Sequence, residues 1–253
     1  MKTEKLSIII PAYNEEYRIT DTVLDIYRTM SAQPFDYEIL VVNDGSSDNT
    51  VAVVESLAKR IPNLSLINNH ENRGKGWVIK QGMLKVTGNF RLFMDADNST
   101  RVEEVIKMLP HLRQGTHVVV GSRCLPGSKI VIEQPLLRVF LGFVFRTITH
   151  MIVPIGVNDS QCGFKVFTEK SAQVIFPEQT IYHWSFDVEI LAIAKKKKLK
   201  IKEMPVSWRN NKESHMNFLA MVRSFFEIIQ IRLKLWGIST TFFARFLFTQ
   251  KSN

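Results

Sequence analysis

The chain contains little cysteine. Only Cys124 and Cys162 occur among its 253 residues. Two cysteines exclude a framework of disulfide bonds and provide no zinc-like cluster. So low a cysteine content is typical of proteins in a reducing environment, and it favours a location that faces the cytosol.

Long uncharged runs are also missing. The longest stretch without Asp, Glu, Lys or Arg covers residues 147–158, which is 12 residues, whereas a membrane-spanning helix needs about 20 apolar residues. The N-terminal sequence MKTEKLSIIIPAYNEE does not resemble a signal peptide, because its apolar run is short and meets Pro11 and a pair of glutamates. We therefore predict no transmembrane helix.

Positive charge is concentrated in the last quarter of the chain. Residues 190–253 contain 13 Lys or Arg and 3 Asp or Glu, a net charge of +10, whereas residues 1–189 contain 20 and 21, a net charge of −1. This asymmetry indicates a polyanionic partner, either nucleic acid or an anionic membrane surface. The basic tail has no recognisable RNA- or DNA-binding motif.

Short apolar runs alternate with helical patterns in the first half of the chain. The runs are continuous, as expected of strands covered on both faces, and lie at residues 6–10, 37–43, 64–68, 90–94 and 117–121. Helical patterns separate them at residues 15–31, 48–60, 76–86 and 101–113. Ser47 or Asp48 is the expected N-cap of the second helix, and residues 98–100 that of the fourth. The alternation predicts an α/β fold with right-handed crossovers and a parallel sheet.

Polar segments follow four of these strands. They read PAYNEE, NDGSSDNT, DADNST and GSR. Because ligands of parallel α/β sheets bind beyond the carboxyl ends of the strands, we expect the four segments to form one site.

The segment DADNST places Asp95 and Asp97 two residues apart at the end of a strand. Residues i and i+2 of a strand point the same way, so both carboxylates face one side. Such a pair suits Mg²⁺ or Mn²⁺, which takes the rest of its ligands from waters and substrate phosphates. The alternative is an Asx-type turn that caps the next helix.

Two further segments carry groups that suit a nucleotide. Asp44 of NDGSSDNT can accept hydrogen bonds from a base or a ribose, and Arg73 and Lys75 of NRGKGW suit a phosphate near a helix N-terminus. The alternatives are a plain turn for the first segment and an ordinary solvated loop for the second.

The order of these motifs resembles that of the family-2 glycosyltransferases with the GT-A fold. The resemblance covers residues about 5–210. The later segments NDSQCGFKVF, WSFDVEIL and IKEMPVSW are similar to the dolichyl-phosphate glucosyltransferase and polyprenyl-phosphate sugar synthase branch. The resemblance implies a Rossmann-like, mostly parallel sheet flanked by helices. We therefore expect a glycosyltransferase domain over residues 1–210. The charge and the apolar pattern of residues 211–253 predict a basic, amphipathic segment that associates with a membrane.

The resemblance also implies roles for individual residues. Those expected to bind the nucleotide are Pro11, Ala12, Tyr13, Glu15, Asp44, Lys75, Asp95 and Ala96. Asp95 and Asp97 would bind Mg²⁺ or Mn²⁺, and the residues expected at the reacting groups are Asp97, Arg123, Asp159 and Gln161. Two positions depart from the family pattern: Asn43 stands where many relatives have aspartate, and Ser99 stands where some mannosyl relatives have glutamine. The second departure leaves the third protein ligand of the metal open.

The implied reaction is an inverting transfer of a hexose, with UDP-glucose favoured as donor, to a polyprenyl or dolichyl phosphate. A lipid phosphate is already anionic and needs no general base. It needs cations to position it, which are expected to be Arg123, Lys129, Arg138 and Arg146. The alternative acceptor is a glycan or protein hydroxyl, for which Asp159 or Asp187 can serve as base.

Two long apolar helices are predicted at residues 135–153 and about 216–236. The second has a narrow polar stripe, formed by Arg223, Glu227, Gln230 and Lys234. Apolar arcs this wide predict that one side packs on the sheet domain while another enters the lipid interface. We therefore expect a peripheral protein at the cytoplasmic face of a membrane. The alternatives are a buried helical hairpin or an interface of a homo-oligomer. A separate alternative for the function is a non-enzymatic protein that binds nucleic acid through its basic tail. We favour the enzyme and therefore expect no nucleic acid partner.

Overall fold

A seven-stranded sheet forms the centre of the structure, which is a computed structural model that describes residues 4–132, 136–210 and 218–238. The strand order is β3-β2-β1-β4-β7-β5-β8. The strands of this sheet are β1 Lys5–Ala12, β2 Asp36–Asp44, β3 Leu64–Asn69, β4 Phe90–Met94, β5 Val118–Ser122, β7 Phe164–Thr168 and β8 Ile201–Pro205. A small second sheet pairs β6 (Lys129–Ile132) with β9 (Ser207–Arg209).

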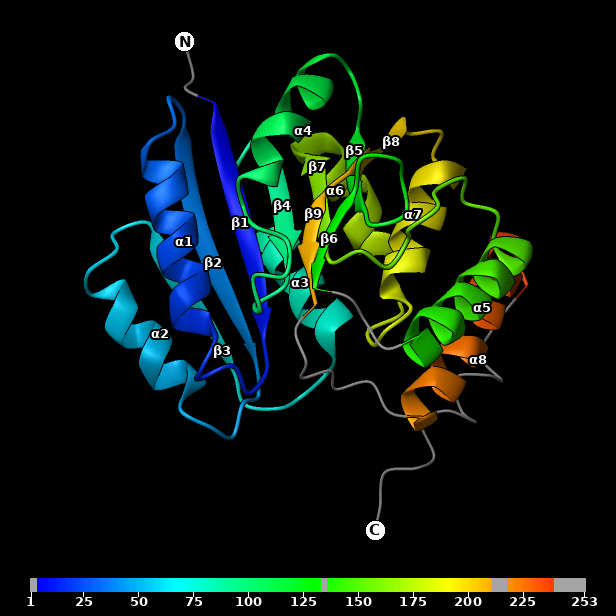
Figure 1. Cartoon of the computed structure of the whole chain (residues 1–253), viewed down its shortest axis with the longest axis horizontal. Helices are drawn as coiled ribbons and strands as arrows, with labels where there is room; N and C mark the ends of the chain where they lie inside the picture. Colours follow the sequence, from blue (N-terminus) through cyan, green and yellow to red (C-terminus); the bar gives the residue numbers. More distant parts are fainter. Residues whose placement is uncertain (1–3, 133–135, 211–217, 239–253) are drawn as a thin grey trace.

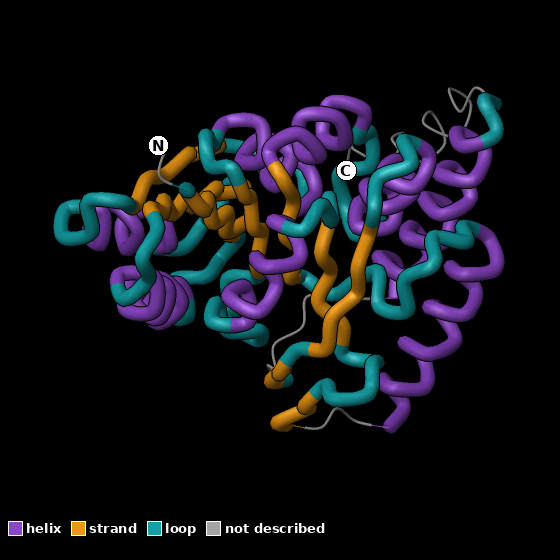
Figure 2. The backbone as a smooth tube through the Cα atoms, turned by 90° about the horizontal axis from the view of Figure 1, so that it is seen from above, coloured by secondary structure: helices purple, strands orange, loops and turns teal. Residues whose placement is uncertain are grey.

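Helices cover both faces of the sheet (Figures 1 and 2). They are α1 Ile19–Ser31, α2 Thr50–Ala58, α3 Lys75–Lys85, α4 Glu104–Arg113, α5 Leu136–Ile152, α6 Glu169–Ile175, α7 Phe186–Lys196 and α8 Phe218–Leu235, with a 3₁₀ turn at Phe176–Glu178. Successive residues of β1 serve opposite layers: Ile8 and Ile10 pack with α1, α2 and α4, whereas Ile9 packs with α3, α6 and α7. The predicted α/β fold with strands buried on both faces is confirmed.

The sheet is mostly parallel, as predicted, but strand β7 was not predicted. β1 runs parallel to β2 and β4, and β5 runs parallel to β8. β7 is antiparallel to both of its neighbours and separates β4 from β5. Lys165 interrupts the apolar pattern of this strand and nevertheless is fully buried, which is why the sequence pattern did not reveal it.

The expected helix caps are wrong. The N-caps of α2 and α4 are Asn49 and Glu103, and neither side chain makes a capping hydrogen bond. Asp48 instead accepts from the backbone N–H of Thr50 at 3.0 Å. Asn98 adopts a φ of 53°, so the chain turns after β4 and α4 begins later than predicted.

α8 packs on the sheet domain through α7 and also contacts α5. Its Ile228 and Ile231 are buried in the same core layer as α7. Two members of its polar stripe also face the domain: the Glu227 carboxylate accepts from the Ser185 N–H at 3.1 Å, and the Lys234 ammonium reaches Glu189 at 2.8 Å. Among the residues described, no helix combines the length and the apolar character needed to cross a bilayer.

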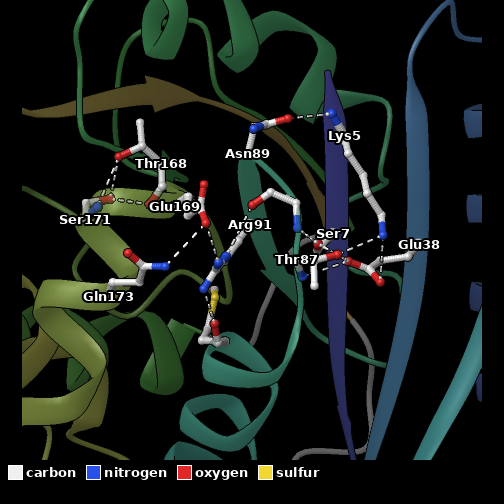
Figure 3. A network of polar contacts seen from close by, with 12 residues as sticks. Lys5, Ser7, Glu38, Thr87, Asn89, Arg91, Thr168, Glu169, Ser171 and Gln173 are labelled. Atoms are coloured by element: carbon white, nitrogen blue, oxygen red, sulfur yellow. Dashed lines mark hydrogen bonds and ion pairs between the residues drawn. The ribbon is translucent and has the colours of Figure 1, made fainter. Parts of the chain in front are cut away.

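A polar network joins β1, β2, β4 and α6 at the edge of the sheet where β1 and β4 begin (Figure 3). Arg91, only 3% exposed, donates to the Met83 carbonyl at 2.7 Å and lies 3.5 Å from the Glu169 carboxylate. Glu38 accepts from the Ser7 hydroxyl at 2.6 Å and pairs with Lys5 at 3.1 Å. Each buried polar group has a partner, so this network has a structural role.

Candidate active site

The segments that follow β1, β2 and β4 meet at the carboxyl edge of the sheet, which is the lower edge in Figure 1. The Glu15 N–H donates to the Thr50 hydroxyl at 2.7 Å, which joins the β1 segment to the start of α2. The Thr22 hydroxyl donates to the Ala96 carbonyl at 2.6 Å and so joins α1 to the β4 segment. These contacts join three of the four segments that the sequence analysis expected to form one site.

Asp95 and Asp97 leave β4 as expected, but they make different contacts. Asp95 forms an ion pair with the ammonium of Lys75. A Cβ at Gly163 would overlap the Asp95 carboxylate, so the segment QCGF fits closely against it. Asp97 accepts from the Ser99 N–H at 2.9 Å and from the Ser99 hydroxyl at 2.8 Å. The Asx-type turn is therefore present together with the pair of carboxylates.

Lys75 lies among carboxylates. Burial opposes its charge, but Asp95, Asp187 and Asp97 together outweigh burial and raise the pKa of Lys75. Asp187, one of these carboxylates, forms an ion pair with Lys165, and both side chains are buried. The Lys165 ammonium also donates to the Cys162 carbonyl at 2.6 Å. This ion pair leaves Asp187 poorly placed to act as the base that an alcohol acceptor would need.

The pKa of the Glu15 carboxyl is well above its ordinary value. Burial raises the pKa of Glu15 to about 7, against the opposing effect of Arg18, and the charges of Asp97 and Asp95 add to the rise. Arg18 Nε lies 2.8 Å from the Glu15 carboxylate. A carboxyl with this pKa changes its protonation near neutral pH, in direct proximity to the two aspartates.

Asp44 turns both carboxylate oxygens toward the loop that precedes α3. It accepts from the N–H groups of Arg73 at 2.8 Å and Gly74 at 3.0 Å. Burial raises the pKa of Asp44, and these two hydrogen bonds oppose the rise. Gly74 has a φ of 101°, and a Cβ there would meet the Tyr182 carbonyl. Asp44 therefore fixes the position of Lys75, in addition to any contact with a nucleotide.

Arg123 and Asp159 form a tight pair after β5. The Asp159 carboxylate accepts from the Arg123 N–H at 2.9 Å, from Nε at 2.7 Å and from Nη2 at 2.8 Å. Burial opposes ionisation of Asp159, but Arg123 outweighs it and holds the pKa below its usual range. The guanidinium carbon lies 5.4 Å from the ring centroid of Trp208. Asp159 is thus a carboxylate that orients Arg123.

The other cations expected near the acceptor are only partly brought together. Arg146 donates to the Cys124 sulfur at 2.6 Å, next to Arg123 in the chain. Lys129 is exposed on β6. Arg138 lies in α5, and its side chain falls outside the part that the structure describes.

The remaining expected residues differ in their exposure to solvent. Pro11 and Ala12 are buried at the end of β1, and Tyr13 is 42% exposed. Ala96 is buried between the two aspartates, and Gln161 is partly exposed beside the buried Cys162. Lys165 was missed; a lysine within an otherwise apolar run is the signal that could have identified it, because unpaired lysine is almost never fully buried.

The donor set fits a divalent cation that shares its ligands with a substrate. Within residues 4–132, 136–210 and 218–238, no three side chains of His, Cys, Asp or Glu are placed to hold a metal by themselves. Asp95 and Asp97 supply hard carboxylate oxygens, and Mg²⁺ is commonly held by one or two carboxylates with substrate phosphates and waters.

Comparison with known proteins agrees with this geometry. The glycosyl transferase family 2 profile matches residues 7–176. A dolichyl-phosphate beta-glucosyltransferase of Trichomonas vaginalis is 37% identical over 251 residues, which cover 92% of this chain and 73% of that protein. The enzyme of that name from Homo sapiens is 31% identical over 246 residues, with 92% and 76% covered.

Solved structures show the same fold. Mannosyl-3-phosphoglycerate synthase from Rubrobacter xylanophilus superimposes with a TM-score of 0.71 at 17% identity, covering 95% of this chain and 78% of that one. Glucosyl-3-phosphoglycerate synthase from Mycobacterium tuberculosis, in complex with Mn²⁺, UDP and glucosyl-3-phosphoglycerate, gives a TM-score of 0.69 at 19% identity, covering 94% and 82%. These likenesses confirm the expected fold class, an α/β sheet of the GT-A type.

Proposed function

The chain belongs to glycosyl transferase family 2, and from this premise we propose that it transfers glucose from UDP-glucose to dolichyl phosphate or another polyprenyl phosphate, with inversion at the anomeric carbon. The observation that carries the proposal is the alignment with dolichyl-phosphate beta-glucosyltransferases over 92% of the chain at 31–37% identity. The paired carboxylates at the end of β4 support the donor chemistry.

The donor site uses the residues after β1, β2 and β4. Pro11, Ala12, Tyr13 and Ala96 form the surface against the base and ribose, with Glu15 beside them. Asp95 and Asp97 would hold Mg²⁺ or Mn²⁺, which would supply positive charge against the departing diphosphate. Asp44 positions the loop of Lys75, whose ammonium adds a second positive charge near the diphosphate.

The acceptor site uses Arg123. Its guanidinium is oriented by Asp159 and Trp208 and presents a fixed set of donors to a phosphate. Asp159 is occupied by Arg123 and Asp187 by Lys165, so neither carboxylate is well placed to deprotonate an alcohol. This arrangement supports an acceptor that is already anionic over a glycan or protein hydroxyl. Lys129, Arg138 and Arg146 are proposed to assist with the lipid phosphate.

We propose that the protein lies at the cytoplasmic face of a membrane and that it consists of two parts. Residues 1–210 form the catalytic domain, and residues 211–253 form the membrane-associating segment. Of that segment the structure describes only 218–238, where Phe225, Trp236 and Ile238 are exposed. On α5, Val139, Phe143 and Met151 are exposed as well. Exposed aromatic and aliphatic side chains on neighbouring helices suit contact with lipid.

One assay tests the proposed reaction. The purified chain is incubated with a panel of sugar nucleotides, Mg²⁺ or Mn²⁺, and a short polyprenyl phosphate, and the product is identified by mass. We expect a hexosyl polyprenyl phosphate from UDP-glucose and none in EDTA. Transfer to a water-soluble alcohol, with no product from the polyprenyl phosphate, would refute the proposed acceptor. Full activity in EDTA would refute the role of the metal.

A further inference from the structure

Lys75 occupies a position that conflicts with a metal ion. Its ammonium forms an ion pair with Asp95 Oδ1, and Asp95 is one of the two carboxylates that fit a divalent cation. A cation bound to Asp95 and the ammonium of Lys75 would lie within a few ångströms of each other. At such a distance the two positive charges repel each other.

The charges around Lys75 alternate in sign. Asp95, Asp187 and Asp97 all act electrostatically on the Lys75 ammonium, and Asp187 in turn pairs with Lys165. With Lys165 pairing with Asp187, the group consists of three carboxylates and two ammonium groups. Lys75 is therefore the cation that compensates Asp95 when no other cation is present.

The backbone of Lys75 is fixed, but its side chain is a flexible four-carbon stem. Asp44 holds the N–H groups of Arg73 and Gly74, and the Gly76 N–H donates to the Tyr182 carbonyl at 2.7 Å. Lys75 is also the first residue of α3, where the helix favours negative charge. The ammonium can consequently change partners without any movement of the main chain.

We propose that Lys75 is a displaceable counter-ion of the metal site: it neutralises Asp95 in the empty enzyme, and it passes to the donor diphosphate when a divalent cation takes Asp95. The proposal rests on the proposed glycosyl transfer from a nucleotide diphosphate sugar. According to the proposal, Lys75 weakens metal binding in the absence of nucleotide. It strengthens binding of the diphosphate in the presence of metal. A lysine with a purely structural role would not have these opposite effects.

The test measures binding and needs neither sugar nor acceptor. The dissociation constant of Mn²⁺ alone is measured by the electron paramagnetic resonance signal of free Mn²⁺, and that of UDP in saturating Mg²⁺ by calorimetry. For Lys75→Met we expect Mn²⁺ to bind about tenfold more tightly than to the unaltered chain, and UDP to bind about tenfold more weakly. Lys75→Arg keeps the charge and is expected to leave Mn²⁺ binding near that of the unaltered chain.

Matched controls separate charge from folding. Lys85→Met changes an exposed lysine on the same helix and should alter neither constant. Lys75→Gln replaces Lys75→Met if the latter does not reach the melting temperature of the unaltered chain. Unchanged or weaker Mn²⁺ binding by both charge-free variants would overturn the proposal, as would unchanged UDP binding. If none of the proteins binds Mn²⁺, with or without UDP, the two aspartates do not form a metal site and the proposal is wrong. Failure of the proposed glucosyl transfer would appear only in the product assay.

Discussion

Ser99 fixes the direction of the Asp97 carboxylate, because its N–H donates to one oxygen at 2.9 Å and its hydroxyl donates to the other at 2.8 Å. The sequence left the third metal ligand open at this position. The contacts instead make Ser99 a group that orients a ligand, and such partners commonly affect metal affinity or activity by about 10- to 100-fold.

A graded loss of activity is therefore expected at these two residues. Asp97→Ala should reduce metal-dependent turnover by at least about a hundredfold, because a charge-bearing ligand is removed. Ser99→Ala should reduce it by about tenfold and raise the Mg²⁺ concentration needed for half-maximal rate. Steady-state rates over a Mg²⁺ titration measure both effects. Ser56→Ala, at an exposed position of α2, is the control; equal losses for Ser99→Ala and Asp97→Ala would contradict the orienting role.

Glu15 links stability to pH. The folded state holds the carboxyl with a pKa of about 7, compared with 4.5 for an unperturbed glutamate. The folded chain therefore retains a proton that the unfolded chain has already released, so the stabilisation is full below about pH 4.5 and is lost as pH rises through about 7. For this one group the loss amounts to about 3 kcal/mol.

Urea unfolding in EDTA at pH 5 and pH 8 tests the effect. We expect the unfolding free energy of Glu15→Gln to depend less on pH than that of the unaltered chain. Between pH 5 and pH 8 the variant should therefore lose less stability than the unaltered chain. Glu55→Gln, at an exposed position of α2, should leave the dependence unchanged. A pH dependence that is equal in all three proteins would show that Glu15 ionises normally.

At the scale of elements, a buried charge fastens α8 to the sheet domain. The Lys234 ammonium donates to Glu189 Oε1 and to the Glu178 carbonyl, both at 2.8 Å. Glu189 is 1% exposed, and removal of its cation leaves a buried carboxylate with only neutral donors. Lys234→Met should lower the free energy of unfolding by about 1–3 kcal/mol.

Urea unfolding of Lys234→Met measures this contribution. Lys170→Met, at an exposed position of α6, should stay within about 0.5 kcal/mol of the unaltered chain. A Lys234→Met protein as stable as the control would mean that α8 is not held in this way in solution.

The strands that the sequence predicted are those with continuous apolar runs. β4 matches its predicted range, and the bounds of β1 and β5 differ by one or two residues. β7 could not be predicted in this way, because the partner that makes a buried Lys165 tolerable is Asp187, which lies 22 residues later in the chain. Hydrophobic periodicity is a local signal, whereas charge compensation in a core is set by tertiary contacts.

The candidate site shows the same division. The position of Asp95 and Asp97 at a strand end follows from local pattern, and so does that of Asp44. Their partners do not: Asp44 binds a loop 29 residues away, and Asp159 binds Arg123 across 36 residues. The sequence therefore indicated which carboxylates belong to the site, and the structure adds which of them are already compensated.

At the scale of the whole molecule, exposed apolar side chains gather on the elements that follow β5. They lie on β6, α5 and α8 and directly after α8, and they are Ile130, Val131, Ile132, Val139, Phe143, Met151, Phe225, Trp236 and Ile238. α5 and α8 lie side by side, away from α1 and α2 (Figure 1). The proposed acceptor is a lipid, and the same part of the chain carries Arg123 and Arg146. A membrane that contacts these helices would bring the lipid phosphate to the cations of the acceptor site.

Flotation with liposomes that contain anionic lipid tests this surface. Phe143→Ser combined with Trp236→Ser should lower the bound fraction, because each large apolar side chain contributes about 1.5–3 kcal/mol when removed from water; together they should weaken partitioning by more than about tenfold. Ile106→Ser, on α4 of the opposite layer, is the control. Removal of residues 237–253 tests the tail separately, and unchanged flotation after that removal would assign binding to the helices before it. If neither change reduces flotation and the chain forms a stable dimer, the apolar surface is an interface between copies of the chain.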